Sequence, residues 1–166
     1  MKKTNQKAQS PRYLDRKLSA AKRVKDLLSR MTLEEKAAQM MGVWQQKADK
    51  LVDAAGNFDL DKARANFKEG HGLGQVGRPS DAGGGRNAHD TAQLTNEIQR
   101  FFLAESRLGI PVIFHEECLH GQAAIDATSF PQPIGLGATF NPELAERLFT
   151  MTAEEARVRG THQASA

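Results

Sequence analysis

A short apolar run in the second half of the chain stops abruptly at charged side chains. Residues 110–114 read Ile-Pro-Val-Ile-Phe, and His115, Glu116 and Glu117 follow at once. Four or five apolar, largely β-branched residues bounded by glycine and polar residues are typical of a short buried strand. Parallel α/β proteins place their sites at the carboxyl ends of strands, so this point is the first candidate for a site.

Strand and helix patterns alternate along the chain. Strands are expected to start near residues 40, 72, 110 and 161, and helical patterns separate them. A repeated βα pattern implies a parallel sheet. Four such units make half of an eight-stranded barrel, although the pattern alone fits a small doubly wound sheet equally well.

Capping residues mark several helix boundaries. Thr32 followed by Glu35 is a capping box, in which each side chain accepts a hydrogen bond from a backbone donor at the helix start. Asn141 is the expected N-cap of a later helix, which Gly160 ends. Helices are expected over 12–30, 32–39, 59–69, 87–108 and 141–160, strands over 40–44, 72–77 and 110–115, and a glycine-rich loop over 78–87.

The composition fits one soluble globular domain with a polar tail. The chain has 166 residues, of which 39% are hydrophobic and 26% charged. Residues 1–11 are polar and expected to be disordered, which leaves 12–166 as the domain. Neither a secretory signal nor an apolar stretch of about 20 residues is visible, so we expect a cytoplasmic chain with no membrane partner.

Positive charge is concentrated at the N-terminus. Residues 1–30 contain ten Lys and Arg against Asp15 and Asp26. A basic arm can bind nucleic acid, but base stacking would require a pattern of interleaved aromatic residues that this segment lacks. We therefore expect a solvated basic helix and no nucleic-acid partner.

The glycines Gly72, Gly74 and Gly77 match the spacing of a dinucleotide-binding fingerprint. That motif requires a helix to begin directly after the glycines, so that its N-terminus can hold a pyrophosphate. Here Arg-Pro-Ser-Asp-Ala-Gly-Gly-Gly follows and cannot start such a helix. We interpret the glycines as part of a strand and its loop, and expect no cofactor.

A metal site and a thiol nucleophile are also considered at the end of the predicted strand. His115 and His120 are five residues apart, about 140° around a helix, so they cannot bind one zinc ion from one face. Cys118 is the single cysteine, which excludes an internal disulfide. No orienting third group is evident, so we expect no metal and a buried, inert thiol.

Four segments resemble the N-terminal barrel domain of family 3 glycoside hydrolases, the β-glucosidase and β-xylosidase group. They are GLGQVGRPSD (72–81), LGIPVIFHEECLHG (108–121), SFPQPIGLGATFNPEL (129–144) and EEARVRGTHQA (154–164). The resemblance extends from about residue 23 to residue 164. It favours an α/β fold that is a truncated (β/α)8 TIM-type barrel, comprising the first three to four βα units, or half of the barrel.

The resemblance also selects one carboxylate. Neighbouring residues on a strand point to opposite faces, so Glu116 and Glu117 cannot both face a cleft. In the family, an acidic residue before x-x-His-Gly binds hydroxyls of the sugar, and Glu117 matches that position. His115 lies on the same face and is expected to support the pocket, while Arg78 and Asp81 are candidates by position alone.

Other functional residues of the family have no counterpart in this sequence. A sugar-binding Arg-Asp-Pro-Arg-Trp-Gly-Arg loop, a Lys-His pair, the Asp nucleophile and the general acid all come later in family members. The resemblance implies a retaining hydrolase of β-glucosides or β-xylosides in the intact relative, with carbohydrate as partner. We expect the 166-residue chain alone to be inactive. The alternative is a non-catalytic sugar-binding or assembly module that self-associates through an open sheet edge near Thr161.

Overall fold

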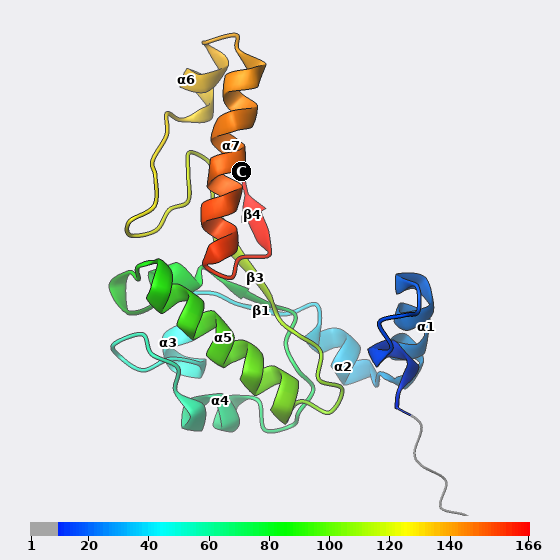
Figure 1. Cartoon of the computed structure of the whole chain (residues 1–166). Helices are drawn as coiled ribbons and strands as arrows, with labels where there is room; N and C mark the ends of the chain where they lie inside the picture. The colour runs from blue at the N-terminus through cyan, green and yellow to red at the C-terminus, as the bar shows by residue number, and fades with distance from the viewer. Residues whose placement is uncertain (1–9) are drawn as a thin grey trace, which may run out of the picture. The chain divides into compact units, whose positions relative to one another are not determined.

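The computed structural model describes residues 10–166, and the chain divides into two compact units, Met1–Ala37 and Ala38–Ala166. Figure 1 shows the elements of both units. Residues 1–9, most of the predicted tail, lie outside the described residues. No helix among residues 10–166 is both long enough and apolar enough to cross a membrane.

The first unit contains a 3-10 helix, η1 (Arg12–Leu14), the α-helix α1 (Ala20–Arg30) and all but the last residue of α2 (Leu33–Ala38). The prediction of one helix over 12–30 is wrong, because the chain turns between Leu14 and Ala20. The Asp15 carboxylate accepts a hydrogen bond from the backbone of Lys17 at 3.0 Å, which favours a turn over a continuing helix.

The capping box at the start of α2 is confirmed. The backbone N–H of Thr32 donates to Oε2 of Glu35 at 2.8 Å, and the backbone N–H of Glu35 donates to Oγ1 of Thr32 at 3.2 Å. The two side chains thus satisfy two backbone donors that a helix start leaves without partners.

The second unit is built on a parallel four-stranded sheet in the order β1-β2-β3-β4. Its strands are β1 (Gly42–Val43), β2 (Gln75–Gly77), β3 (Ile113–Glu117) and β4 (Gln163–Ser165). Gly77 pairs with His115, and Glu117 pairs with Ser165. The predicted parallel α/β fold is confirmed, and all four strands lie near their expected positions.

Strand β3 begins at Ile113 rather than at residue 110. The side chain of Gln99 donates to the carbonyl of Val112 at 2.7 Å and accepts from its N–H at 2.8 Å. Pro111 has no backbone N–H, so it cannot donate a hydrogen bond to a neighbouring strand. The segment before Ile113 is therefore held by a glutamine side chain instead of a neighbouring strand.

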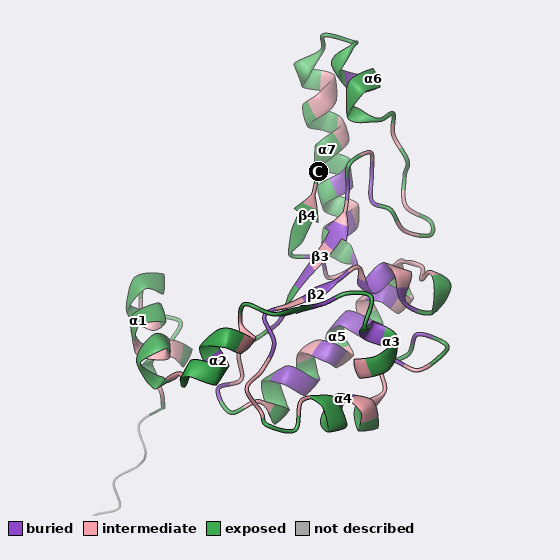
Figure 2. Cartoon of the chain, turned by 180° about the vertical axis from the view of Figure 1, so that it is seen from behind, coloured by how far each residue is buried: buried purple, intermediate pink, exposed green. Residues whose placement is uncertain are grey.

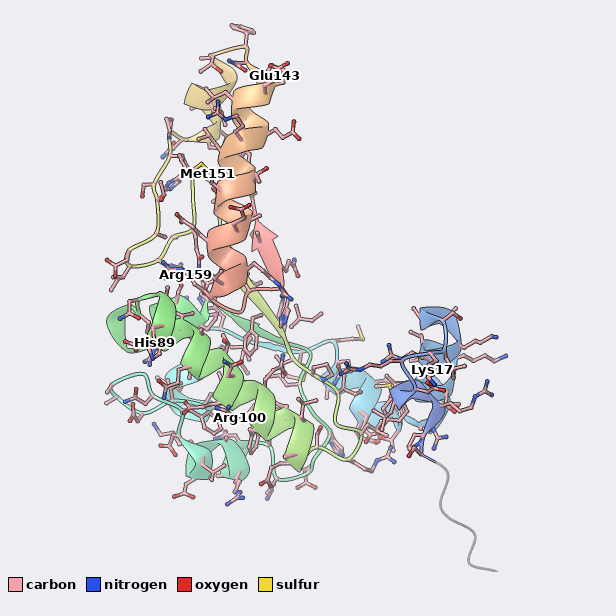
Figure 3. All side chains as sticks on the ribbon, in the orientation of Figure 1. Lys17, His89, Arg100, Glu143, Met151 and Arg159 are labelled. Carbon is pink, nitrogen blue, oxygen red and sulfur yellow. The ribbon has the colours of Figure 1, made fainter. Side chains whose placement is uncertain are left out.

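Six helical segments connect the strands: α3 (Lys47–Lys50), α4 (Leu60–Asn66), the 3-10 helix η2 (Pro79–Gly84), α5 (Ala88–Glu105), α6 (Pro133–Gly137) and α7 (Pro142–Val158). Asn141 caps α7 as predicted, accepting from the N–H of Leu144 at 2.9 Å. Helices α3 and α6 are not expected from the sequence, and the predicted loop over 78–87 contains η2. Figure 3 shows Glu143 in the first turn of α7 and Arg159 just beyond its end.

Helix α5 covers one face of the sheet and contributes four residues to the core. Figure 2 shows buried residues along the side of α5 nearest the strands. The core includes Leu94, Ile98, Phe101 and Phe102 of α5, Val43, Val76, Val112 and Phe114 from the strands and the segment before β3, and Leu51, Val52, Ala63, Leu73 and Ala82 from the connecting segments. The alternate residues of β3 lie on the opposite face, where Ile113 is 49% exposed. One face of the sheet is therefore open.

Candidate functional site

Polar side chains gather at the carboxyl ends of β1, β2 and β3. Trp44 directly follows β1, Arg78 and Asp81 follow β2, and His115 and Glu117 belong to β3. Parallel strands end at the same edge of the sheet, so the segments that follow them are neighbours. The structure brings three of the four predicted site residues, Arg78, Asp81 and His115, around Trp44.

Trp44 is the centre of this group. The guanidinium carbon of Arg78 lies 5.9 Å from the centroid of the indole ring, and the His115 ring meets the indole edge-on at 6.4 Å. The indole N–H donates to Oδ2 of Asp81 at 3.5 Å. Trp44 nevertheless remains 40% exposed. An aromatic ring that is fixed by its neighbours and still accessible is suited to contact a ligand.

Lys47 lies beneath this group and fixes it. Its side chain donates to the carbonyls of Trp44 at 2.8 Å and Gly77 at 2.9 Å, and it forms an ion pair with Oδ1 of Asp81 at 2.9 Å. Burial lowers the pKa of Lys47, and the ion pair with Asp81 opposes that shift. One ammonium group thereby holds the segment after β1 against the loop after β2.

Glu116 anchors the same loop from the other face of the sheet. It is fully buried, and its carboxylate accepts from the N–H of Ser80 at 2.9 Å and from the Ser80 hydroxyl at 2.8 Å. Burial raises the pKa of Glu116, while the two bonds from Ser80 act against that shift. Both carboxylate oxygens are therefore occupied by the protein itself.

Gly74 and Gly77 both allow close packing, but only Gly77 belongs to β2, whereas Gly74 directly precedes that strand. A Cβ at Gly77 would lie 2.5 Å from Cε1 of His115 and 3.2 Å from Cβ of Trp44. A Cβ at Gly74 would overlap the backbone of Gln39. Arg78 then turns the chain with a left-handed φ of 48°, and no α-helix begins until α5. The geometry of a dinucleotide site is absent from these described residues.

Glu117 ends β3 on the open face, two residues beyond His115. It is half-buried, and within residues 10–166 its carboxylate forms no hydrogen bond or ion pair. Its backbone is fixed, because the carbonyl accepts from the N–H of Ala123 at 2.9 Å. Glu117 is thus a positioned carboxylate with free acceptor oxygens, whereas those of its neighbour Glu116 are satisfied internally.

Cys118 is buried, and its thiol is a poor nucleophile. It is 1% exposed, and burial together with the nearby carboxylates of Glu116 and Glu117 raises its pKa to about 11. The thiolate is the reactive form, so at neutral pH little of this buried thiol is in the reactive state. Within the described part of the chain, no three His, Cys, Asp or Glu side chains are grouped to hold a metal ion.

Comparison with sequence models of known protein families shows to which family the chain belongs. The sequence model of the glycosyl hydrolase family 3 N-terminal domain matches residues 32–166. The chain belongs to glycoside hydrolase family 3. The resemblance seen in the sequence is thereby confirmed, and the parallel α/β sheet is the fold of this family's N-terminal domain.

The relatives of this family 3 chain are glycosidases. It is 33% identical over 156 residues to a putative β-xylosidase of Formosa agariphila, covering 93% of this chain and 20% of that protein. It is 31% identical over 161 residues to a periplasmic β-glucosidase/β-xylosidase of Dickeya chrysanthemi, covering 92% of this chain and 24% of that protein.

A solved β-glucosidase structure has a similar fold. It is a β-glucosidase from Erythrobacter marinus, with a TM-score of 0.76 and 37% identity, covering 95% of this chain and 20% of that one. The chain therefore spans about a fifth to a quarter of the length of these relatives.

Sequence reasoning missed Trp44, Lys47, Ser80 and the role of Glu116. A lone tryptophan at the last position of a predicted strand was the available signal for Trp44. The other three act through contacts between segments 30 or more residues apart, which no local pattern reveals.

Proposed function

We propose that this chain forms part of the substrate site of a β-glycosidase and that Glu117 binds hydroxyl groups of a β-glucoside or β-xyloside. The observation that carries the proposal is the free carboxylate of Glu117, positioned at the carboxyl end of β3 on the open face. A carboxylate can accept two hydroxyl hydrogen bonds, and its charge strengthens each of them. The names of the glycosidase relatives support the choice of sugar.

His115 and Arg78 would complete the wall of this site. Both lie beside Trp44 at the same edge of the sheet as Glu117. Asp81 is bound by Lys47 at 2.9 Å and would act by holding Arg78 and Trp44 in place rather than by binding sugar. In this arrangement the four strands would be the first half of an eight-stranded barrel, with the open face toward its interior.

The 166-residue chain alone would bind sugar without cleaving it. Retaining hydrolysis needs two carboxyl groups about 5–5.5 Å apart on either side of one glycosidic bond. Glu116 lies on the other face and is bound by Ser80, so it cannot act with Glu117. Within the described strands and loops, Glu117 would therefore be a ligand of the substrate rather than one of a catalytic pair.

Calorimetric titration of the chain with xylose and with glucose tests this function. The Glu117→Gln variant keeps the size of the side chain and loses its charge, so binding should weaken by about tenfold or more. Glu154→Gln is the matched control, because Glu154 is exposed on α7. Equal affinities of the two variants would show that Glu117 does not hold the sugar.

The open sheet favours a second candidate function, a module that associates with another copy through its sheet. Ile113 is 49% exposed on the open face, and within the described sheet β1 and β4 each have one neighbouring strand. Unpaired strand edges are templates for association. Analytical ultracentrifugation distinguishes the two, because a monomer at high concentration would exclude self-association.

A further inference from the structure

Two backbone N–H groups at the start of β3 donate to side chains instead of to backbone carbonyls. The N–H of Val112 donates to Oε1 of Gln99 at 2.8 Å, and the N–H of Phe114 donates to Nδ1 of His162 at 3.0 Å. A glutamine amide keeps its acceptor at every pH. An imidazole loses its acceptor when it is protonated, and its ordinary pKa lies close to physiological pH.

His162 holds both backbone groups of Phe114. Its own N–H donates to the carbonyl of Phe114 at 2.9 Å, while its Nδ1 atom accepts from the N–H of Phe114. The two rings are stacked, with centroids 5.6 Å apart and planes 20° from parallel. Phe114 is 1% exposed, so its N–H would be left buried without a partner if the imidazole moved away.

This imidazole nitrogen stands where a backbone carbonyl would otherwise be. In a regular parallel ladder, the N–H of Phe114 would donate to the carbonyl two residues before His162, which belongs to Gly160. Gly160 has a left-handed φ of 92° just after α7, and β4 begins only at Gln163. The chain is still turning at Gly160, so the histidine side chain supplies the acceptor instead.

We propose that His162 is a pH-dependent clasp, whose neutral imidazole holds the start of β4 against β3 and whose protonation loosens that contact. The clasp lies at the edge of the sheet, where β4 follows α7 and pairs with β3 (Figure 1). The inference goes beyond the proposed function, because it concerns the assembly of the sheet and does not depend on sugar binding.

The hydrogen bond to Phe114 fixes the state of the ring. Because Nδ1 accepts a hydrogen bond, it carries no hydrogen, and the hydrogen of the neutral ring is on Nε2. An imidazolium carries a hydrogen on both nitrogens. Protonation at Nδ1 would therefore set two N–H donors against each other and leave the N–H of Phe114 without an acceptor. Only the neutral ring closes the clasp.

The surroundings of His162 disfavour the imidazolium. The residue remains accessible to solvent and lines a cavity of about 340 Å³. Partial burial of the ring lowers the pKa of His162 below its ordinary value of 6.5, and the charge of Arg157 adds to the shift. Among the described residues that line this cavity, Arg157 is the one other charged side chain, whereas α5 and β3 contribute the neutral residues Ala92, Thr95, Asn96, Gln99 and Phe114.

The strand that the clasp holds also fixes the carboxyl end of β3. Glu117 pairs with Ser165 of β4, and the N–H of Cys118 donates to the carbonyl of Ser165 at 2.7 Å. Loosening β4 at His162 should therefore increase the mobility of the backbone around Glu117. The clasp would make the order of this part of the sheet depend on pH.

NMR of the ¹⁵N-labelled chain during a titration from neutral to acid pH tests the proposal. We expect the imidazole of His162 to titrate below 6.5 and the amide proton of Phe114 to shift with the same midpoint. In His162→Asn the Oδ1 atom can take the place of Nδ1 and does not titrate, so this shift of Phe114 should disappear. His89→Asn is the matched control, because His89 is exposed on α5, and it should keep the shift.

Hydrogen exchange and urea unfolding measure the consequence. At acid pH the amide of Phe114 should exchange about tenfold faster in the original chain than in His162→Asn, since one hydrogen bond is lost. The stability of the original chain relative to His162→Asn should fall as the pH drops from 6.5 through the lower pKa of the folded chain. His162→Phe keeps an aromatic ring but has no acceptor, so its Phe114 amide should exchange rapidly at every pH.

A pKa of His162 at or above 6.5 would overturn the clasp. So would an amide shift of Phe114 that does not follow the titration of His162, or one that persists in His162→Asn. None of these measurements includes a sugar, so their failure leaves the proposed function standing. Equally, a chain that binds no sugar can still show the clasp.

Discussion

The ammonium group of Lys47 lies 2.9 Å from Oδ1 of Asp81, and this ion pair joins the segment after β1 to the loop after β2. Lys47 also donates to the carbonyls of Trp44 and Gly77. Asp81, one of the two predicted site residues after β2, is therefore bound by a lysine that lies outside the family motifs seen in the sequence. The candidate site is supported from beneath by a buried cation.

Replacing this lysine should destabilise the chain. Lys47→Met leaves Asp81 with only the longer ion pair to Arg78 and removes one donor from the carbonyls of Trp44 and Gly77, which we expect to cost about 2–3 kcal/mol. The cost stays below that of a fully buried pair because the Asp81 side chain is 35% exposed. Urea unfolding measures it, with Lys68→Met as the control, since the Lys68 side chain is 75% exposed. Equal stability of the two variants would contradict the structural role of Lys47.

Glu116 should make stability depend on pH in a defined direction. Burial raises its pKa above the ordinary value of 4.5, so the folded chain binds the proton more tightly than the unfolded chain. The resulting stabilisation is present at low pH and is lost as the pH rises through the folded-state pKa. Glu116→Gln removes this titration.

The stability of the original chain relative to Glu116→Gln should therefore fall as the pH rises from the ordinary pKa of 4.5 through the higher pKa of the folded chain. Urea unfolding at several pH values measures that difference. Glu154→Gln should show no such trend, because Glu154 is exposed. A relative stability that rises with pH would mean that the two bonds from Ser80 outweigh burial and lower the pKa of Glu116.

Gly77 should tolerate no side chain. In Gly77→Ala the new Cβ would lie 2.5 Å from Cε1 of His115 and 3.2 Å from Cβ of Trp44, so the His115 ring must shift. We expect a loss of about 1–3 kcal/mol in stability and a shift in Trp44 emission. Gly137→Ala is the control, since nothing lies within 4 Å of its added Cβ. Unchanged emission in Gly77→Ala would show that His115 does not constrain the indole.

Cys118 should react slowly with thiol reagents in the folded chain. With a pKa of about 11, roughly one thiol in a thousand is ionised at pH 8, and burial restricts access further. Alkylation by iodoacetamide should be slow in buffer and fast in guanidinium chloride. Equally rapid alkylation in both conditions would place Cys118 outside the core.

The sequence predicted local features well. The capping box of Thr32 and Glu35, the N-cap Asn141 and the parallel order of strands depend on neighbouring residues or on a repeated pattern. The alternation that separates Glu116 from Glu117 follows from strand geometry and matches the burial of the two side chains.

Features that depend on distant contacts were not predictable. The start of β3 is set by Gln99, 13 residues earlier, and Trp44 is positioned by residues from two other strands and their loops. Such contacts follow from the register between strands, which the sequence pattern does not specify. The turn at Asp15 was missed because a helical pattern of apolar residues continues through it.

Amide chemical shifts in a ¹⁵N-labelled sample test most directly whether a sugar binds at the end of β3. During titration with xylose, we expect the largest shifts at the amides of His115, Glu117 and Trp44, and we expect Glu117→Gln to abolish them. Shifts confined to the separate cavity of about 230 Å³ beside Phe67 and Leu73, or shifts equal in size in the variant, would contradict the proposed site.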